Sequence, residues 1–566
     1  SSTVLILAAA LVAAGQGMTV TVNTTLGPLE GVVADGVARF LGVPFAKPPV
    51  GALRFRAPQA AAPWGPTTLQ AFKEAPTCPQ LRIIGNLSVK SDWSEDCLYL
   101  DLWTPYPIPG GAPMMTFIHG GGFVFGDELG SAGNGTFNGT YLATRHGIVV
   151  ASVSYRLGVL GFLAHPALRA EDPDSSTGNM GIRDQRMAMT WVRDNAAAFG
   201  GDVNRILLFG QSAGAFSVCH HLSNAASGGL FTSVILESGQ CDSPSFFPAL
   251  DVAEEFGTAF SAAMGCNSTA LGDVGFLSCL REKPVMDLLP TLLSWFSPDW
   301  PNPSSGHPLP GPHSALAPVM VSPPPPPPFS SWGPAIDGTS VGLPTLPLDS
   351  IKAGTYNRVK NIIAGTNADE GAYFVPMFIV VAQTSYPITD AGIRKALLHV
   401  QDNATLVDSV LNEYPEASYD NADSRMAAIV RDVCLACPTR RLHDAVSGSA
   451  NQSSFMYEFT FVPPTLFGDL FHCYHAAELP YVFHSEKKRG FTPEEEEVSH
   501  LLETFWSNAA YSGGNPNTGP TKPVLAWPEY STASRPNIVL NTKATLGSDL
   551  YKEHCDFWDA MPVSFC

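Results

Sequence analysis

One serine in this chain lies in a pattern that is typical of an enzymatic nucleophile. Ser212 has a glycine two residues before it and another two residues after it, in the sequence Gly-Gln-Ser-Ala-Gly. An apolar run, 206–209, precedes this pattern, and a helix-compatible stretch follows it. In such a strand–turn–helix the turn is so sharp that the flanking positions need glycine, and the serine hydroxyl is exposed. The spacing therefore predicts a nucleophile elbow centred on Ser212.

A glycine-rich segment upstream could stabilise the negative charge that an attacking serine creates. Residues 115–118 read as a buried strand, and His-Gly-Gly-Gly follows directly. Attack on a carbonyl builds charge on its oxygen, so backbone N–H groups must already point there, and glycine allows the main chain to approach closely. We predict an oxyanion hole made by the N–H groups of Gly121, Gly122 and Ala213.

These two motifs, with several further blocks, resemble the type-B carboxylesterase/lipase family of α/β-hydrolases, which includes the cholinesterases. The blocks follow one another in the family's order between about residues 27 and 558. Examples are Ser-Glu-Asp-Cys-Leu-Tyr-Leu at 94–100 and Gly-Asn-Met-Gly-Ile-Arg-Asp-Gln at 178–185. The resemblance implies an α/β-hydrolase fold with a large, mostly parallel central sheet covered by helices on both faces. It also implies hydrolysis of carboxylic esters without a cofactor or a metal.

The resemblance assigns the histidine and the acid that would complete a catalytic triad. The base must take the serine proton and later return it, which suits a histidine. His475 begins the block His-Ala-Ala-Glu-Leu-Pro-Tyr-Val-Phe, where the family places its catalytic histidine, whereas His472 lacks this context. The family's acid corresponds to Glu370, and Asp369 is the alternative in the same loop. The order serine, acid, histidine is that of the α/β-hydrolases.

Other residues near the elbow have less specific interpretations. His220 and His221 follow the nucleophile closely but lie on the predicted helix that leads away from the site, so we interpret them as surface or packing residues. Phe123, Phe246 and Phe247 could line an acyl or alcohol pocket, but core phenylalanines would look the same in the sequence.

Two features disfavour a dedicated acetylcholinesterase. Gln211 stands where many relatives have glutamate, which removes a negative charge beside His475. Our hypothesis is that the substrate pocket attracts cations less than a cholinesterase pocket does, although a neutral exchange of similar side chains is equally open. The 18 residues between Cys78 and Cys97 form a shorter loop than in cholinesterases, and Trp93 lies too close to Cys97 to supply that loop's cation–π surface. We therefore expect a general carboxylesterase or a lipase-like enzyme.

Composition and charge limit the partners. A formal net charge of −19 argues against nucleic acid and against a basic membrane-binding surface. No apolar run approaches the roughly 20 residues that span a bilayer. We predict one catalytic domain over residues 18–566, interrupted by a Pro-rich insertion at about 297–331. This insertion is interpreted as a solvated surface loop, with substrate gating or an SH3-like partner as alternatives.

Several features indicate the secretory pathway. Residues 3–14 resemble the apolar core of a secretory signal, so residues 1–17 are interpreted as a truncated signal peptide, with a buried N-terminal helix as the alternative. The chain has eleven cysteines, which fits an oxidising compartment. Glycosylation sequons begin at Asn23, Asn86, Asn134, Asn138, Asn267, Asn403 and Asn451.

The resemblance implies two local disulfides, Cys78–Cys97 and Cys266–Cys279. A third bridge is expected from Cys434 or Cys437 to Cys555, and the sequence leaves this choice open. Four cysteines have no assigned partner, and the odd total leaves at least one thiol free or intermolecular: Cys219, Cys241, Cys473 and Cys566.

The same fold also occurs in non-catalytic adhesion or binding proteins, so a binding function is the alternative to an esterase. Such relatives typically lack a triad member, whereas serine, glutamate, histidine and the oxyanion glycines are all present here. The sequence therefore favours a secreted serine esterase. It does not determine the natural ester, the preferred acyl length, interfacial activation or the oligomeric state.

Overall fold

The structure is a computed structural model that describes residues 17–80, 93–130, 135–243, 246–289, 332–382, 384–449, 451–485 and 490–561. The predicted signal segment up to residue 16 lies outside these ranges, and so does the whole predicted Pro-rich insertion at 297–331.

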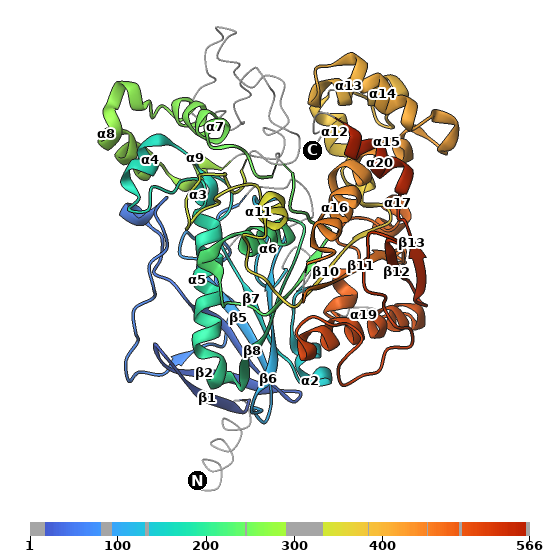
Figure 1. Cartoon of the computed structure of the whole chain (residues 1–566). Coiled ribbons are helices and arrows are strands. Elements are labelled where there is room, and N and C mark those ends of the chain that lie inside the picture. The colour runs from blue at the N-terminus through green and yellow to red at the C-terminus, as the bar shows by residue number, and fades with distance from the viewer. Residues whose placement is uncertain are drawn as a thin grey trace, which may run out of the picture.

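A single 13-stranded sheet organises the molecule (Figure 1). Its strands are connected in the spatial order β1-β2-β3-β5-β7-β6-β8-β9-β10-β11-β12-β13, and β4 pairs with β2. The strands are β1 (Thr19–Thr24), β2 (Gly27–Ala34), β3 (Val37–Pro44), β4 (Leu69–Gln70), β5 (Tyr99–Pro105), β6 (Ala112–Ile118), β7 (Val149–Val153), β8 (Gly201–Gln211), β9 (Ser233–Glu237), β10 (Asn361–Asn367), β11 (Ser453–Phe459), β12 (Pro536–Leu540) and β13 (Thr545–Ser548).

The centre of the sheet is parallel and its edges are antiparallel. β7, β6, β8, β9, β10, β11 and β12 form successive parallel pairs, whereas β1, β2, β3, β5 and β13 pair antiparallel. All residues of β6, β7 and β9 are buried, as expected of parallel strands that are covered on both faces. The predicted mostly parallel sheet is confirmed.

Helices cover both faces of this sheet, as predicted. Leu208 of β8 belongs to the core on one face, whereas its neighbours Leu207 and Phe209 belong to the core on the other face. α5 (Met180–Asn195) and α6 (Ala213–Ser223) contribute buried residues to the first core. α2 (Thr140–His146) and α19 (Pro493–Ser512) contribute to the second core.

Local sequence signals set the ends of the longer helices. α19 begins with a capping box between Thr492 and Glu495, has proline in its first turn, and ends at Gly513 in a left-handed conformation. The other helices are α3 (Gly158–Phe162), α4 (Pro166–Glu171), α7 (Leu250–Ala263), α8 (Ser268–Glu282), α9 (Val285–Leu288), α11 (Pro347–Ala353), α12 (Val375–Val381), α13 (Asp390–Val400), α14 (Ala404–Glu413), α15 (Ala422–Arg431), α16 (Cys437–Val446), α17 (Leu466–Phe471), α18 (Leu479–Val482) and α20 (Lys552–Ala560).

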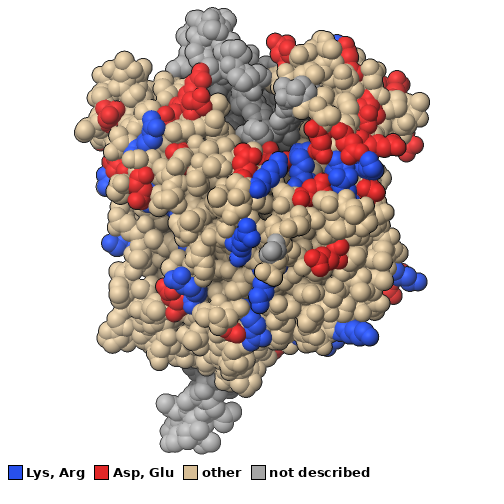
Figure 2. Space-filling view, in the orientation of Figure 1, with Lys and Arg blue, Asp and Glu red and all other residues tan. Residues whose placement is uncertain are grey.

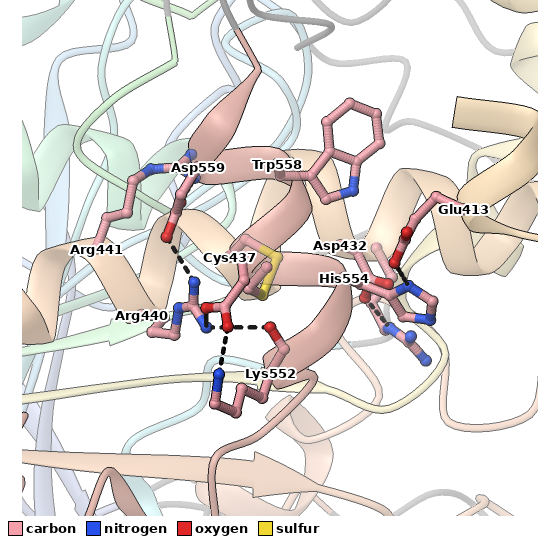
Figure 3. The surroundings of a disulfide bond; sticks show 12 residues. Glu413, Asp432, Cys437, Arg440, Arg441, Lys552, His554, Trp558 and Asp559 are labelled. Atoms are coloured by element: carbon pink, nitrogen blue, oxygen red, sulfur yellow. Dashed lines mark hydrogen bonds and ion pairs between the residues drawn. A yellow bond between two sulfur atoms is a disulfide. The ribbon is translucent and has the colours of Figure 1, made fainter. Parts of the chain in front are cut away.

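A third core lies among helices at one end of the molecule. It contains buried residues of α12, α13, α14, α15 and α20. The Cys437–Cys555 disulfide joins α16 to α20 at this core (Figure 3). Beside it, Arg440 and Arg441 both donate to the Asp559 carboxylate, at 2.5 and 2.8 Å. The bridge and these ion pairs fix the last described helix against α16.

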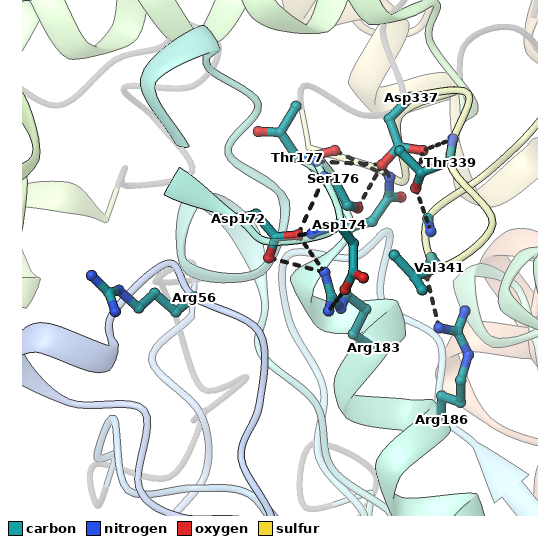
Figure 4. A network of polar contacts seen from close by, with 12 residues as sticks. Arg56, Asp172, Asp174, Ser176, Thr177, Arg183, Arg186, Asp337, Thr339 and Val341 are labelled. Atoms are coloured by element: carbon teal, nitrogen blue, oxygen red, sulfur yellow. Dashed lines mark hydrogen bonds and ion pairs between the residues drawn. The ribbon is translucent and has the colours of Figure 1, made fainter. Parts of the chain in front are cut away.

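A buried carboxylate, that of Asp337, anchors the described segment that begins at residue 332. Asp337 accepts from the Ser176 hydroxyl at 2.5 Å and from the Asn179 side-chain amide at 3.0 Å (Figure 4). Its other oxygen accepts from the backbone N–H groups of Thr339 and Leu343, both at 3.0 Å. These bonds tie residues 337–343 to the segment that precedes α5.

Among the described residues, no helix is both long and apolar enough to cross a membrane. Acidic side chains are spread over the face drawn in Figure 2, and several lie beside Lys and Arg in the region of α16 and α20.

Candidate active site

Ser212 occupies a strained turn between β8 and α6. Its backbone angles are φ 55° and ψ −124°, a conformation that is costly for a residue with a side chain. The neighbouring glycines are needed for steric reasons. A Cβ on Gly210 would lie 2.5 Å from the Gly214 carbonyl carbon, and one on Gly214 would lie 1.9 Å from the Ile118 oxygen. The turn therefore has the geometry of a nucleophile elbow.

The glycine-rich loop after β6 lies against this turn. A Cβ added to Gly120 would be 3.0 Å from Ser212 Cβ. Gly121 and Gly122 have φ angles of 103° and 58°, which favour glycine. Neither donates its N–H to any residue that the structure describes. The N–H of Ala213 is also without an intrahelical partner, because it lies in the first turn of α6.

His119 holds the start of the glycine loop in place. Its ring stacks on Tyr155 at 4.4 Å, and its Nδ1 donates to the Gly120 carbonyl oxygen at 2.8 Å. The Tyr155 hydroxyl donates to the His119 carbonyl oxygen at 2.8 Å. Burial lowers the pKa of His119, so this ring stays neutral. His119 thus supports the loop, because its ring both stacks on Tyr155 and donates to Gly120.

The histidine and the acid that the resemblance assigned lie in direct contact. His475 Nδ1 is 2.6 Å from Glu370 Oε2, and both side chains are buried. Glu370 follows β10, at the start of a 3₁₀ helix, whereas His475 follows α17. This contact fixes the proton on Nδ1 and leaves Nε2 as the acceptor.

Asn367, at the end of β10, connects the two loops that carry this pair. Its backbone N–H donates to Glu370 Oε1 at 2.8 Å. Its side-chain amide donates to the Tyr474 carbonyl oxygen at 2.8 Å and to Glu478 Oε2 at 2.6 Å. One residue therefore positions the acid through its backbone and the residue that precedes His475 through its side chain. No motif in the sequence distinguishes this asparagine from other strand-end polar residues.

His475 Nε2 faces Gln211, the residue before the serine. The Gln211 Nε2 atom lies 3.2 Å from His475 Nε2. Since Nδ1 carries the proton, the glutamine amide is the donor in this contact. Ser212 Oγ makes no hydrogen bond with any described residue. The lone pair that would accept the serine proton is thus held by the neighbouring amide.

The alternative residues make other contacts. Among the described residues Asp369 accepts from the Cys473 N–H at 3.1 Å, and it makes no hydrogen bond or ion pair with His475. His472 is exposed. His221 is buried and bonds to Ser227 and Gln185, and burial lowers the pKa of both His220 and His221. These two histidines are packing residues.

The aromatic residues that the sequence suggested for a pocket pack elsewhere. Phe123 and Phe247 are buried in the core, and Phe246 is partly buried and stacks on Phe216 of α6 at 4.1 Å. Phe374 contacts the His475 ring instead, with 4.9 Å between ring centroids. Sequence analysis missed Phe374, because an aromatic residue after the acid carries no motif of its own.

Two further buried glutamates, Glu478 and Glu237, form a cluster with Glu370. Burial and the Glu370 carboxylate raise the pKa of Glu478 to about 7. Burial and then Glu478 raise the pKa of Glu237, whose Oε1 accepts from Trp506 Nε1 at 2.7 Å. One oxygen of each carboxyl group has no hydrogen-bond partner. The cluster retains protons at a pH where exposed glutamates are ionised.

The disulfides settle the pairings that the sequence left open. Cys78–Cys97 and Cys266–Cys279 are formed, and Cys437 is the partner of Cys555. Cys434 is also disulfide-bonded. Cys219 on α6 pairs with Cys241 after β9, a bridge that sequence analysis did not assign. Cys473 is the free and buried thiol among the described residues. The loop between Cys78 and Cys97 is mostly outside the described ranges, and Trp93 forms a β-bridge with Thr77 at its base.

Comparisons with known proteins agree with this architecture. The family model described as "Carboxylesterase family" matches residues 18–558. An acetylcholinesterase of Bungarus fasciatus is 32% identical over 577 residues, which cover 96% of this chain and 87% of that protein. A solved structure of a PNB esterase superposes with a TM-score of 0.73 at 27% identity, covering 94% of this chain and 99% of that one. The chain therefore belongs to the carboxylesterase family and is a type-B carboxylesterase with the α/β-hydrolase fold.

Proposed function

We propose that the protein is a secreted serine esterase in which Ser212 is the nucleophile, His475 the general base and Glu370 the residue that orients it. The contact of 2.6 Å between His475 Nδ1 and Glu370 Oε2, with Nε2 turned towards the elbow residue Gln211, carries this proposal. A carboxylate on Nδ1 fixes the tautomer whose Nε2 accepts a proton, and it stabilises the imidazolium that forms.

The reaction proceeds through an acyl-enzyme. Ser212 Oγ attacks the ester carbonyl carbon while its proton passes to His475 Nε2. The carbonyl oxygen becomes an oxyanion that accepts from the N–H groups of Gly121, Gly122 and Ala213. When the intermediate collapses, the imidazolium gives its proton to the departing alkoxide, and an alcohol leaves. Water then attacks the acyl carbon with His475 as its base, which releases the carboxylic acid and restores the serine.

Gln211 must release His475 before this cycle begins. Its amide donates to the Nε2 atom that must accept the serine proton. Ester binding would therefore have to exchange one donor for another at this atom, with Ser212 replacing the glutamine amide. This exchange is possible because the two residues are adjacent in the chain and lie on the same turn. Hydrogen bonds of this kind are often completed only when substrate is bound.

The proposed substrates are neutral carboxylic esters, which suit a general carboxylesterase or a lipase-like enzyme. Gln211 is uncharged and its side-chain amide contacts His475 Nε2, so the residue beside this nitrogen carries no negative charge. Trp93 pairs with Thr77 through the backbone beside the first disulfide, which gives it a structural role there. Both observations favour neutral esters over choline esters, in contrast to the name of the Bungarus fasciatus relative.

The proposal of secretion is supported by disulfides and by accessible sequons. Long-lived disulfides are typical of oxidising compartments. Besides Cys437–Cys555, three bridges join cysteines that are close in sequence, with separations of 13 to 22 residues. Four of the sequon asparagines are exposed, as glycan attachment requires: Asn23, Asn267, Asn403 and Asn451.

Hydrolysis of p-nitrophenyl esters tests the assignment. Ser212→Ala and His475→Ala should each lower kcat by on the order of 10⁴-fold or more. The matched control is His472→Asn, because His472 is exposed, and asparagine tolerates its positive φ angle. A fluorophosphonate probe should label the peptide that contains Ser212 and no other. Activity that survives Ser212→Ala would reject the proposal, and an inactive parent protein would favour a binding role.

A further inference from the structure

An exposed apolar surface lies on α17, just before the triad histidine. Leu466, Phe467 and Leu470 are 71%, 41% and 57% exposed, and Tyr373 is 38% exposed. Leu466 and Leu470 are four residues apart, so they project from the same side of the helix. We call these four residues the α17 surface. Single exposed apolar residues are ordinary, but a group of large ones indicates a binding surface.

The backbone of α17 is held firmly, so these side chains are not exposed by fraying. The Thr465 hydroxyl accepts from the Gly468 N–H at 3.1 Å and caps the helix. Gly468 is buried, and a Cβ there would lie 1.9 Å from the Pro463 oxygen. The turn is therefore packed against the preceding segment, and its apolar residues point outward from a fixed support.

A series of aromatic rings connects the α17 surface to His475. Phe467 lies 6.0 Å from Phe471 between ring centroids, and Phe471 lies 6.3 Å from Tyr373. Tyr373 in turn lies 6.4 Å from the His475 ring. The exposed surface is thus continuous with the side chains around the triad histidine. Figure 1 shows α12, which follows Tyr373, and α17 in the same half of the molecule.

The charge around this surface selects the kind of partner. Residues 459–485 and 367–382 contain no lysine and no arginine. The only carboxylate on α17 is Asp469, which is exposed. With a formal net charge of −19, the protein would be repelled by an anionic membrane. An uncharged or zwitterionic lipid surface accepts apolar side chains without needing a basic patch.

We propose that the α17 surface seats the protein on aggregated uncharged or zwitterionic lipid esters, with the triad histidine on the side that faces the lipid. The inference rests on the proposed ester hydrolysis and deepens it, because it names water-insoluble esters as a substrate class. Leu466 and Leu470 enter the lipid surface, and the rings from Phe467 to Tyr373 continue the apolar contact towards His475. Ester molecules leaving the aggregate then reach the active site along apolar side chains.

Flotation of the full-length chain with phosphatidylcholine vesicles tests binding without catalysis. The parent is Ser212→Ala, and the test variant adds Leu466→Ser and Leu470→Ser. The control variant adds Val524→Ser and Leu546→Ser instead, because these residues are 87% and 56% exposed and lie elsewhere. We expect vesicle binding to fall by about tenfold or more in the test variant and to stay at the parent level in the control.

The same pairs of substitutions in the active protein complete the test. The test variant should lose activity on emulsified tributyrin while its kcat/KM for dissolved p-nitrophenyl acetate is unchanged. Failure of the parent to bind vesicles, or equal losses in test and control variants, would overturn the proposal. So would a dimer in the parent that dissociates in the test variant, because the surface would then bind a second copy. If the wild-type protein hydrolyses no ester but its Ser212→Ala variant binds vesicles through α17, the proposed hydrolysis is rejected and the lipid surface stays supported.

Discussion

The side-chain amide of Gln211 donates to the ring nitrogen of His475 that faces away from Glu370, with 3.2 Å between the two nitrogen atoms. A donor at this position occupies the lone pair of Nε2, the atom that would accept the proton of Ser212 in the proposed mechanism. The residue before Ser212 therefore contacts the proposed base directly.

Replacing Gln211 by glutamate should raise kcat/KM for choline esters relative to neutral esters. The substitution keeps the approximate size of the side chain and adds a negative charge beside His475, which would attract a cationic substrate. The measurement is the ratio of kcat/KM for a choline ester to kcat/KM for a neutral ester of the same acyl length.

Gln211→Met keeps the approximate size without charge or donor and is the matched control for this variant. It should not raise the choline-ester ratio. An unchanged ratio in Gln211→Glu would show that the exchange of these side chains is neutral.

Gly120→Ala should abolish most of the activity while leaving the fold intact. The added methyl group would lie 2.8 Å from both the carbonyl oxygen and Oε1 of Gln211, and 3.0 Å from Ser212 Cβ. The oxyanion loop and the elbow would have to move apart, and a displaced oxyanion donor costs on the order of 10²–10³-fold in kcat. Gly110→Ala is the control, because nothing lies within 4 Å of its added Cβ. Equal activity of both variants would contradict this geometry.

Asn367→Ala should lower stability by roughly 1–3 kcal/mol for each buried partner left unsatisfied. The substitution removes the donors to the Tyr474 carbonyl oxygen and to Glu478, but it keeps the backbone N–H that donates to Glu370. We expect a lower urea midpoint and a lower kcat, because the loop segment that precedes His475 is released. Asn361→Ala, at the other end of β10, should lower stability without lowering kcat; a kcat loss there would show a general effect of the strand.

Glu478→Gln should stabilise the protein increasingly as the pH rises from 5 to 8. Burial raises the pKa of Glu478 to about 7, above its ordinary value of 4.5. Between these two values the folded state holds a proton that the unfolded state has lost, so stability falls as the pH rises, and the deficit is complete above pH 7. Glutamine removes this titration. A difference in urea midpoint that is independent of pH would contradict the assignment.

Removing the Cys219–Cys241 bridge should cost about 2–4 kcal/mol of stability and also some activity. This disulfide joins α6, which begins directly after the nucleophile, to the segment before Phe246, which stacks on Phe216. The Cys219→Ala/Cys241→Ala variant is compared with Cys266→Ala/Cys279→Ala, whose bridge lies at α8. Both should have lower urea midpoints, and only the first should lose kcat/KM. Equal kcat/KM losses would show that the bridge does not position the elbow.

Much of this protein was predictable from local sequence. The elbow at Ser212 and the glycine loop depend on steric constraints within a few residues, so short motifs specify them. The parallel core was also predictable, because strands buried on both faces read as continuous apolar runs. The assignment of Glu370 and His475 needed the family resemblance, since 105 residues separate them and no spacing rule joins them.

The contacts between residues far apart in the sequence could be found only in the folded structure. Gln211 and His475 are 264 residues apart in the sequence, and the hydrogen bonds of Asn367 join loops that are more than 100 residues apart. The pairing of Cys219 with Cys241 and the choice of Cys437 over Cys434 depend on which helices pack together. A sequence pattern indicates whether a residue is buried or exposed, but it does not indicate which distant side chain contacts that residue. That choice follows from packing, which only the folded chain determines.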